Sequence, residues 1–515
     1  MKKFLQIFAL CALCVLAAPM VFARNDEPVI TATKDNVYDT IRLLNKSATI
    51  ELIGEIDTET ISKIKSALGI LRDKSFITIK EKINLDLSKT TGLKELPEKA
   101  FFYCLNLKSI TIPSSVESIG DEAFMYSSNL TQIIVDENNT NYKSINGVLY
   151  SKDESVLICY PAQKSARSFM VSENVKTIAK GAFCGIANLE EFFVEKDNDY
   201  FKAVDGVLYN KDGTLLVSYP SNRQAAAFVV PDGTESIAEL AFYRCKLKNL
   251  TFSGNTKTIC DYAFVSCHRL ENVTFQNGLK SIGNYAFDNC CFLKKVVIPD
   301  SLENIGKGGF YECERLKSIT IPCSVRNIGG YAFYHCKSLK SIQIPDGIDI
   351  ISDGIFCGCK NLESVIIPAS VKEIGRSAFA NCSKLRNINL PANTKKIGSS
   401  AFENCKSITN IKIPDNVDNI EAYVFDSCIN LKDVMIPDGI EEIGDKVFRC
   451  CSSLRSITIP SNVKSIGKWA FGGCKNLKTI NYKGSDNQWK QIIKGDNWNG
   501  NCPSPMKINY NYTEN

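Results

Sequence analysis

The chain has few residues of the kinds that carry catalytic chemistry. Its 515 residues include only two histidines, His268 and His335, and each stands directly beside a cysteine. A Cys–His zinc site needs four converging ligands, and a Cys–His nucleophile needs an exposed thiolate. A glycine-rich phosphate loop after a strand is missing as well. We therefore expect no catalytic residue, no metal, no cofactor and no enzymatic activity.

An excess of one charge is also lacking. Lys and Arg number 61 against 56 Asp and Glu, which gives a formal net charge of +5. No long basic run appears in the sequence, and this argues against nucleic acid as a partner. Beyond the N-terminal leader, no stretch approaches the roughly 18 uninterrupted apolar residues of a membrane-spanning helix. A spanning segment is therefore not expected.

The N-terminus has the pattern of a secretory leader. Lys2 and Lys3 precede the apolar residues 4–16, and Val21-Phe22-Ala23 has the small residues of a cleavage site. This pattern predicts a signal peptide over residues 1–23. The mature protein is then expected to be secreted or held at the cell surface.

A repeat of fixed length organises most of the chain. Phenylalanine recurs every 23 residues from Phe264 to Phe471, and a cysteine follows each one three positions later. A complete unit runs from Phe310 through Leu316, Ile319, Ile321 and Pro322 to Ala332. A fixed period of this length is typical of a solenoid, in which each coil buries its apolar face against its neighbours. The Leu-x-x-Ile-x-Ile run predicts a strand, the strands are expected to form a parallel sheet, and Ile-Gly-x-x-Ala-Phe predicts a helical or 3₁₀ return.

Cysteine is abundant, with 22 in the chain. In an exported protein this number would suggest disulfides. In a stacked solenoid, however, a repeated column faces inward, where a free thiol behaves as a small hydrophobe. We expect a ladder of buried thiols, and Cys291, Cys323, Cys357 and Cys450 outside it to oxidise more readily. The column consists of Cys104, Cys245, Cys267, Cys290, Cys313, Cys336, Cys359, Cys382, Cys405, Cys428, Cys451 and Cys474.

Departures from the period define the expected domains. Residues 24–86 do not repeat and predict a small α/β N-terminal cap, and 87–482 form the solenoid. Phe124, Phe183 and Phe242 are 59 residues apart, and an Asn-Gly or Asp-Gly pair between apolar runs marks each extra segment. These pairs predict two β-hairpin insertions, at about 136–168 and 195–227. Residues 483–515, with Trp489 and Trp498, are expected to cap the other end.

The coil resembles the BspA-type leucine-rich repeat family, also described as the Treponema pallidum type. The resemblance rests on Leu454 to Pro460 followed by Ile466 to Cys474, and it extends over residues 87–482. The asparagine column of the wider leucine-rich pattern is broken here by Ser324 and Gly347. The resemblance implies an extracellular protein of a host-associated microbe. It also implies adhesion to matrix proteins such as fibronectin and fibrinogen or to other cells, without shared catalytic residues.

The outward face of the predicted sheet is the candidate binding surface. Positions two and four after the core leucine of each coil point away from the core, and most carry short polar side chains suited to an extended partner. Their simpler interpretation is that they are ordinary soluble strand residues. The aromatic residues of the insertions either anchor an interface or pack between hairpin and solenoid. The candidate contacts are Ser318, Thr320, Ser341, Gln343, Asn387, Asn389, Asn410, Lys412, Tyr150 and Tyr209.

These patterns predict an exported leucine-rich-repeat protein that mediates protein–protein interaction, with extracellular or surface proteins as its partners. Adhesion to host matrix proteins or to other cells is the favoured role. The alternative is a structural surface component whose partner is another copy of itself.

Overall fold

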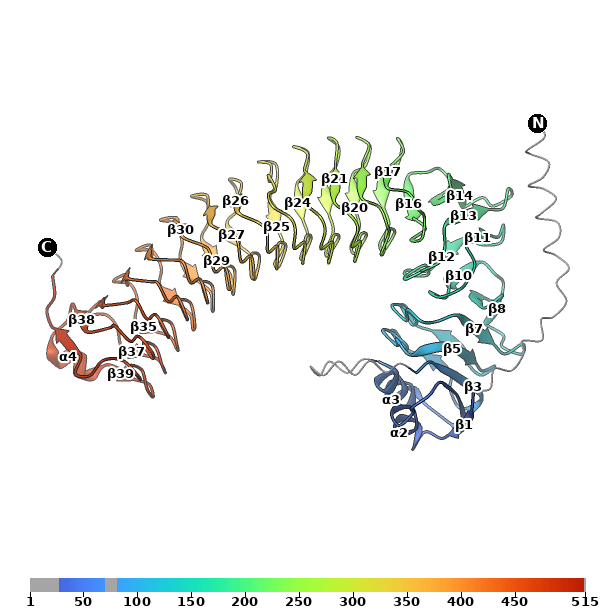
Figure 1. The fold of residues 1–515 in the computed structure, drawn as a ribbon, viewed down its shortest axis with the longest axis horizontal. Helices are drawn as coiled ribbons and strands as arrows, with labels where there is room; N and C mark the ends of the chain where they lie inside the picture. The colour runs from blue at the N-terminus through green and yellow to red at the C-terminus, as the bar shows by residue number, and fades with distance from the viewer. Residues whose placement is uncertain (1–26, 70–80, 514–515) are drawn as a thin grey trace. The chain divides into compact units, whose positions relative to one another are not determined.

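A computed structural model describes residues 27–69 and 81–513 of the chain. The expected signal peptide, residues 1–23, lies outside the described residues. The chain divides into two compact units, Met1–Asn141 and Tyr142–Asn515 (Figure 1). Within the described part of the chain, no helix is long and apolar enough to cross a membrane.

The first unit is built on a five-stranded parallel sheet. Its strands are β1 (Val29–Ala32), β2 (Ala48–Glu55), β3 (Ile83–Thr91), β5 (Leu107–Ile112) and β7 (Gln132–Val135), in that order. The helices α2 (Val37–Arg42) and α3 (Thr58–Leu68) lie between them in sequence, and β4 (Glu95–Leu96) pairs with β6 (Ser118–Ile119). Helix α3 begins where the Asp57 carboxylate accepts a hydrogen bond from the Thr60 amide at 2.8 Å. The cap and the first repeats therefore share one sheet.

The second unit contains both insertions, and each is a three-stranded antiparallel meander. The first consists of β8 (Tyr142–Ile145), β9 (Val148–Ser151) and β10 (Val156–Cys159), and the second of β14 (Phe201–Val204), β15 (Val207–Asn210) and β16 (Leu215–Ser218). The last strand of each meander pairs in parallel with the next coil, β10 with β12 and β16 with β18. Each insertion is thereby hydrogen-bonded into the solenoid.

The remaining coils of the second unit follow one another in a row (Figure 1). Each coil except that of Leu316, which forms only an isolated bridge at Ser318, contributes one strand to the main sheet, and neighbouring strands within a segment pair in parallel and in register, as expected. Hydrogen bonding divides this sheet into segments, with breaks after β13, β23 and β30. Its strands are β11 (Ser168–Val171), β13 (Glu191–Val194), β17 (Ala227–Val229), β19 (Asn249–Thr251), β21 (Asn272–Thr274), β23 (Lys295–Val297), β26 (Ser341–Gln343), β28 (Ser364–Ile366), β30 (Asn387–Ile388), β32 (Asn410–Lys412), β34 (Asp433–Met435), β36 (Ser456–Ile459), β38 (Thr479–Tyr482) and β40 (Lys507–Asn509).

A second ladder of two-residue strands runs beside the main sheet, and in most coils its strand includes the isoleucine of the Ile-Gly pair. These strands are β12 (Thr177–Ile178), β18 (Ser236–Ile237), β20 (Thr258–Ile259), β22 (Ser281–Ile282), β24 (Asn304–Ile305), β25 (Asn327–Ile328), β27 (Ile350–Ile351), β29 (Glu373–Ile374), β31 (Lys396–Ile397), β33 (Asn419–Ile420), β35 (Glu442–Ile443), β37 (Ser465–Ile466) and β39 (Ile493–Lys494). They also pair in parallel, in segments that break after β12, β25 and β33.

The expected helical or 3₁₀ return is wrong. The segment from the Ile-Gly pair to the cysteine, here called the return turn, is a series of turns. Two residues in each return turn have positive φ, such as Tyr331 at 60° and His335 at 53°, and these values interrupt a right-handed helix. The amides bond to the next coil instead, as when the Phe310 amide donates to the Ala332 carbonyl at 2.8 Å.

The core consists of columns that continue from coil to coil. From Phe264 to Phe471 each phenylalanine stacks on the next, with ring centroids 4.8–5.7 Å apart. The twelve column cysteines are all buried and free, which confirms the thiol ladder. From Cys267 to Cys474 their thiols donate to the carbonyl of the phenylalanine one coil earlier, as Cys359 Sγ does to Phe333 O at 3.1 Å. Burial also raises the pKa of these thiols, that of Cys290 to about 11.

The C-terminal segment is a modified coil, with the short helix α4 (Asp486–Gln491) inserted before it. Trp498 takes the place of the alanine before the phenylalanine, because the Phe471 amide donates to its carbonyl at 2.7 Å, as the Phe448 amide donates to the Ala470 carbonyl. Cys502 takes the place of the column cysteine, and its thiol donates to the Phe471 carbonyl at 3.1 Å. The repeat therefore extends beyond residue 482, where the 23-residue period stops.

Candidate functional site

Alternation along each main strand separates a buried face from an exposed one. On β26, Ile342 is buried, whereas Ser341 and Gln343 are exposed. The same pattern recurs on β32 and β34. The residues two and four positions after the core leucine of each coil therefore form one exposed surface, here called the outward face.

The predicted polar contacts lie on this face. Ser341 pairs in register with Ser364 and then Asn387, and Asn410 pairs with Asp433. Lys412 is in line with Met435 and Thr458. Ser318 bridges to Lys295 outside any named strand, and Asn389 follows directly after β30. Seven of the predicted residues have exposed side chains: Ser318, Thr320, Ser341, Gln343, Asn389, Asn410 and Lys412.

The two predicted tyrosine contacts are not on the surface. Tyr150 is 6% exposed and Tyr209 is 2% exposed. Each lies on the middle strand of its meander, β9 or β15, and packs into a hydrophobic cluster with Tyr160 or Tyr219 respectively. Burial raises the pKa of both phenols far above the ordinary value. Both tyrosines therefore pack between hairpin and solenoid, which was the alternative to their being interface anchors.

Exposed aliphatic residues interrupt the polar surface. Ile366 is 60% exposed and Met435 is 46% exposed, and both occupy the fourth position after the core leucine. Val297, on the same column, is also exposed. The sequence-based prediction named the short polar residues of this face as contacts. The 23-residue spacing also places Val297, Ile366 and Met435 on the outward face. The face therefore offers apolar contacts beside hydrogen-bonding groups.

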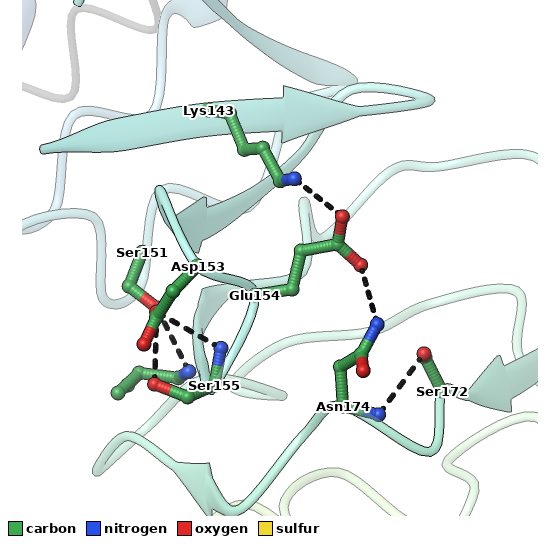
Figure 2. Close-up of polar contacts among 8 residues, drawn as sticks. Lys143, Ser151, Asp153, Glu154, Ser155, Ser172 and Asn174 are labelled. Carbon is green, nitrogen blue, oxygen red and sulfur yellow. Dashed lines mark hydrogen bonds and ion pairs between the residues drawn. The ribbon is translucent and has the colours of Figure 1, made fainter. Parts of the chain in front are cut away.

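A polar network closes the second turn of the first insertion (Figure 2). Asp153 accepts hydrogen bonds from Ser151 Oγ at 2.6 Å and from the Ser155 amide at 3.1 Å. These bonds lower the pKa of the Asp153 carboxyl to about 2. Glu154 pairs with Lys143 across the meander and accepts from Asn174 at 3.3 Å. Each of these bonds holds the turn and its neighbours in place.

Aromatic residues of the return turns also stack from coil to coil. Tyr262 and Tyr285 lie 5.5 Å apart between ring centroids, and Tyr311 and Tyr334 lie 4.5 Å apart. Gly308, with φ of +60°, leaves room for the Tyr285 ring, because a Cβ at this position would lie 2.4 Å from Tyr285 Cε1. These half-buried tyrosines have no fixed column in the repeat, and the sequence did not identify their stacking.

The described surroundings of the two histidines do not form a metal site or a nucleophile–base pair. His335 stacks on Tyr334 at 4.1 Å and lies 3.8 Å from the Glu312 carboxylate. Burial lowers the pKa of both His335 and His268. Among the residues that the structure describes, no three or more His, Cys, Asp or Glu side chains are grouped so that they could hold a metal ion.

The sequence pattern of the BspA type leucine rich repeat region matches residues 58–151, 235–363 and 349–478, in six copies. These matches span well over half of the chain. The chain belongs to this family. The expected leucine-rich-repeat solenoid is confirmed, and proteins of this repeat type generally bind other proteins.

Solved structures of bacterial leucine-rich repeat proteins are similar to this BspA-type chain. One from Eubacterium ventriosum is 23% identical, with a TM-score of 0.42 over 69% of this chain and 89% of its own. One from Bacteroides ovatus is 24% identical, with a TM-score of 0.41 over 60% of this chain and 93% of its own. A leucine rich cell surface protein from Faecalibacterium prausnitzii is 23% identical, with a TM-score of 0.36 over 61% and 95%. Among curated proteins, none matches the sequence.

Proposed function

We propose that this chain is exported and binds other proteins through the outward face, as an adhesin for host matrix proteins or for other cells. One observation carries the proposal. Strand after strand presents short polar side chains at the same two positions, and Ile366 and Met435 lie exposed among them. A surface of this kind offers many small contacts to an extended partner. Ser318, Thr320, Ser341, Gln343, Asn387, Asn389, Asn410 and Lys412 are the proposed contacts.

The proposed mechanism is multivalent contact without chemistry. Neighbouring coils lie about 4.8 Å apart, the spacing of paired strands, so a partner that follows the face meets a new pair of side chains at each coil. Contacts of this kind are individually weak and gain affinity through their number.

The test is binding of the purified protein to immobilised fibronectin, immobilised fibrinogen and immobilised copies of itself. The informative variant replaces Gln343 and Asn389 by Glu, because both side chains are exposed on the outward face. The matched control replaces Ala369 and Ala392 by Glu, since these exposed residues lie beyond the strands of nearby coils. Deletion of 195–227 is unsuitable, because Val207, Tyr209 and Tyr219 belong to the core.

We expect saturable binding that the Gln343 and Asn389 variant weakens at least tenfold and that the alanine-site control retains. Binding to the immobilised copies alone would favour the self-associating structural role instead. Equal binding by both variants would place the contact elsewhere and contradict the proposal.

A further inference from the structure

Stacking brings basic residues together along one edge of the main sheet. From residue 317 to residue 478, the position directly after the core leucine is basic in six coils. All six side chains are exposed, and the backbones of neighbouring coils are joined there, as when the Lys478 amide donates to the Arg455 carbonyl at 3.0 Å. The basic edge consists of Lys317, Lys340, Arg386, Lys432, Arg455 and Lys478.

Within residues 27–69 and 81–513, no ion pair neutralises the charge of the basic edge, because none of the six side chains makes one. Earlier in the same column, Glu271 pairs with Lys294 at 2.7 Å, and Arg167 lies 3.4 Å from Glu190. Only Glu363 adds an acidic residue to the column between Lys317 and Lys478. The uncompensated charge therefore begins at Lys317.

A second row of basic residues strengthens this edge. The turns that lead into the strands add Lys360, Lys384, Lys406 and Lys475, all exposed. The acidic residues nearby are few: Glu314 pairs with Lys337 at 2.5 Å, and Asp433 is exposed on β34. Successive charges of each row are at least one coil apart in the sequence, so the sequence contains no basic run that would indicate this edge. The balanced net charge of the chain conceals a local positive field.

We propose that the basic edge, together with the outward face beside it, binds an acidic segment of a partner protein in extended form. This inference rests on the proposed function and names the chemistry of the partner. Lysine dominates the edge, and an ammonium on a flexible stem attracts carboxylates without demanding one geometry. Exposed charges of this kind raise the association rate and select an oppositely charged partner.

The outward face favours a polypeptide over single-stranded nucleic acid. Nucleic-acid platforms of that type stack bases on aromatic rings. Among the described residues at the outward positions from 318 to 481, no aromatic side chain occurs, whereas Ile366 and Met435 offer aliphatic contacts. Carboxylates of the partner would meet the edge while its apolar side chains meet Ile366 and Met435.

The test is fluorescence anisotropy of a labelled peptide of repeated Glu-Glu-Val, with a Gln-Gln-Val peptide as its neutral counterpart. The edge variant carries K432Q, R455Q and K478Q. The matched control carries K372Q, R376Q and K395Q, which remove the same charges from exposed positions beyond the strands that likewise lack ion pairs among the described residues. We expect the acidic peptide alone to bind, the edge variant to bind it about tenfold more weakly, and high salt to remove the difference.

Three outcomes would overturn the proposal. They are equal loss in both triple variants, equal binding of both peptides, and tighter edge-dependent binding of heparin or a thymidine oligonucleotide than of the acidic peptide. The same variants on immobilised fibronectin and fibrinogen separate this inference from the proposed function. An edge variant that still binds a matrix protein fully leaves the proposed function standing and overturns the acidic-partner inference. A wild-type protein that binds the acidic peptide but no protein surface supports the edge and contradicts adhesion.

Discussion

At the scale of single residues, the cysteine column shows how one position serves the same role in most coils. The thiol fills the space behind the stacked phenylalanines and donates to a carbonyl of the preceding coil. This role was predictable, because the spacing of the column relative to the phenylalanine is constant. The carbonyl partner was not predictable, because it depends on how one coil lies on the next.

The column also sets the reactivity of the thiols. Burial raises the pKa of Cys359 well above its ordinary value, whereas Cys323 and Cys450 are exposed. We expect Ellman's reagent to modify Cys323 and Cys450 within minutes and the column only after unfolding. Mass spectrometry of the labelled peptides checks this order. Rapid native labelling of Cys359 would contradict the buried ladder.

Asp288 gives a residue-scale test of pH dependence. Burial, with Glu312 nearby, raises its pKa from 3.8 to about 6. Between these values the folded chain holds a proton that the unfolded chain has released, so this carboxyl lowers the free energy of unfolding as the pH rises. We expect Asp288→Asn to become more stabilising from pH 4 to pH 7, by at most about 3 kcal/mol. Thermal unfolding of both proteins at pH 4 and pH 7 measures the difference in their free energies of unfolding. A difference that does not change with pH would contradict the raised pKa of Asp288.

At the scale of elements, the meanders were predictable and the return turns were not. Asn146-Gly147 and Asp205-Gly206 have positive φ throughout, as the tight hairpin turn they predict requires. In the return turns the left-handed positions hold Tyr262, Ser377 or Lys446, residues that rarely announce such a conformation. Hydrogen bonds between coils hold them there, as when the Tyr262 amide donates to the Asn284 carbonyl at 2.9 Å, and these bonds cannot be seen in a single repeat.

Gly308 tests how closely neighbouring return turns pack. Its substitution by alanine would place a Cβ against the Tyr285 ring, whereas Gly233, also with positive φ, has open space. We expect Gly308→Ala to destabilise the protein by about 1–3 kcal/mol more than Gly233→Ala. Denaturant unfolding measures the difference. In a Tyr285→Ala background the difference should shrink, and its persistence would show that the ring is not the cause.

At the scale of the whole molecule, the C-terminal coil ends the stack of the second unit. Trp489 and Trp498 pack 6.1 Å apart between ring centroids, and Trp498 lies edge-on to Phe471 at 6.1 Å. The aromatic content of this segment predicted a seal. Its identity as a coil was hidden, because the insertion of α4 breaks the period and Asn499 stands where the phenylalanine would be.

Truncation tests the role of this coil. A chain that ends at Tyr482 would expose the now buried Phe471 and Cys474, and terminal repeats without a cap are prone to unfold and aggregate. We expect a lower unfolding temperature and strong binding of an apolar dye. A control that ends at Asn509 keeps Trp498, Cys502 and β40, so it should behave like the full chain. Equal behaviour of the two truncations would show that the coil does not seal the core.

The proposed binding surface was predictable in part. The period alone places Ser341, Gln343 and Asn410 on the exposed face. Tyr150 and Tyr209 lie in the core because their meanders pair with the next coils, and that pairing has no local sign in the sequence. The basic edge appears only when residues one coil apart are placed side by side.

Binding through the outward face is tested most directly by hydroxyl-radical footprinting of the protein in complex with the matrix protein that it binds. Ile366 and Met435 report on the outward face, and Ile350 and Ile429 are exposed aliphatic residues away from it. We expect the partner to slow oxidation of Ile366 and Met435 and to leave Ile350 and Ile429 unchanged. Protection of Ile350 and Ile429 with free oxidation of Met435 would contradict binding through the outward face.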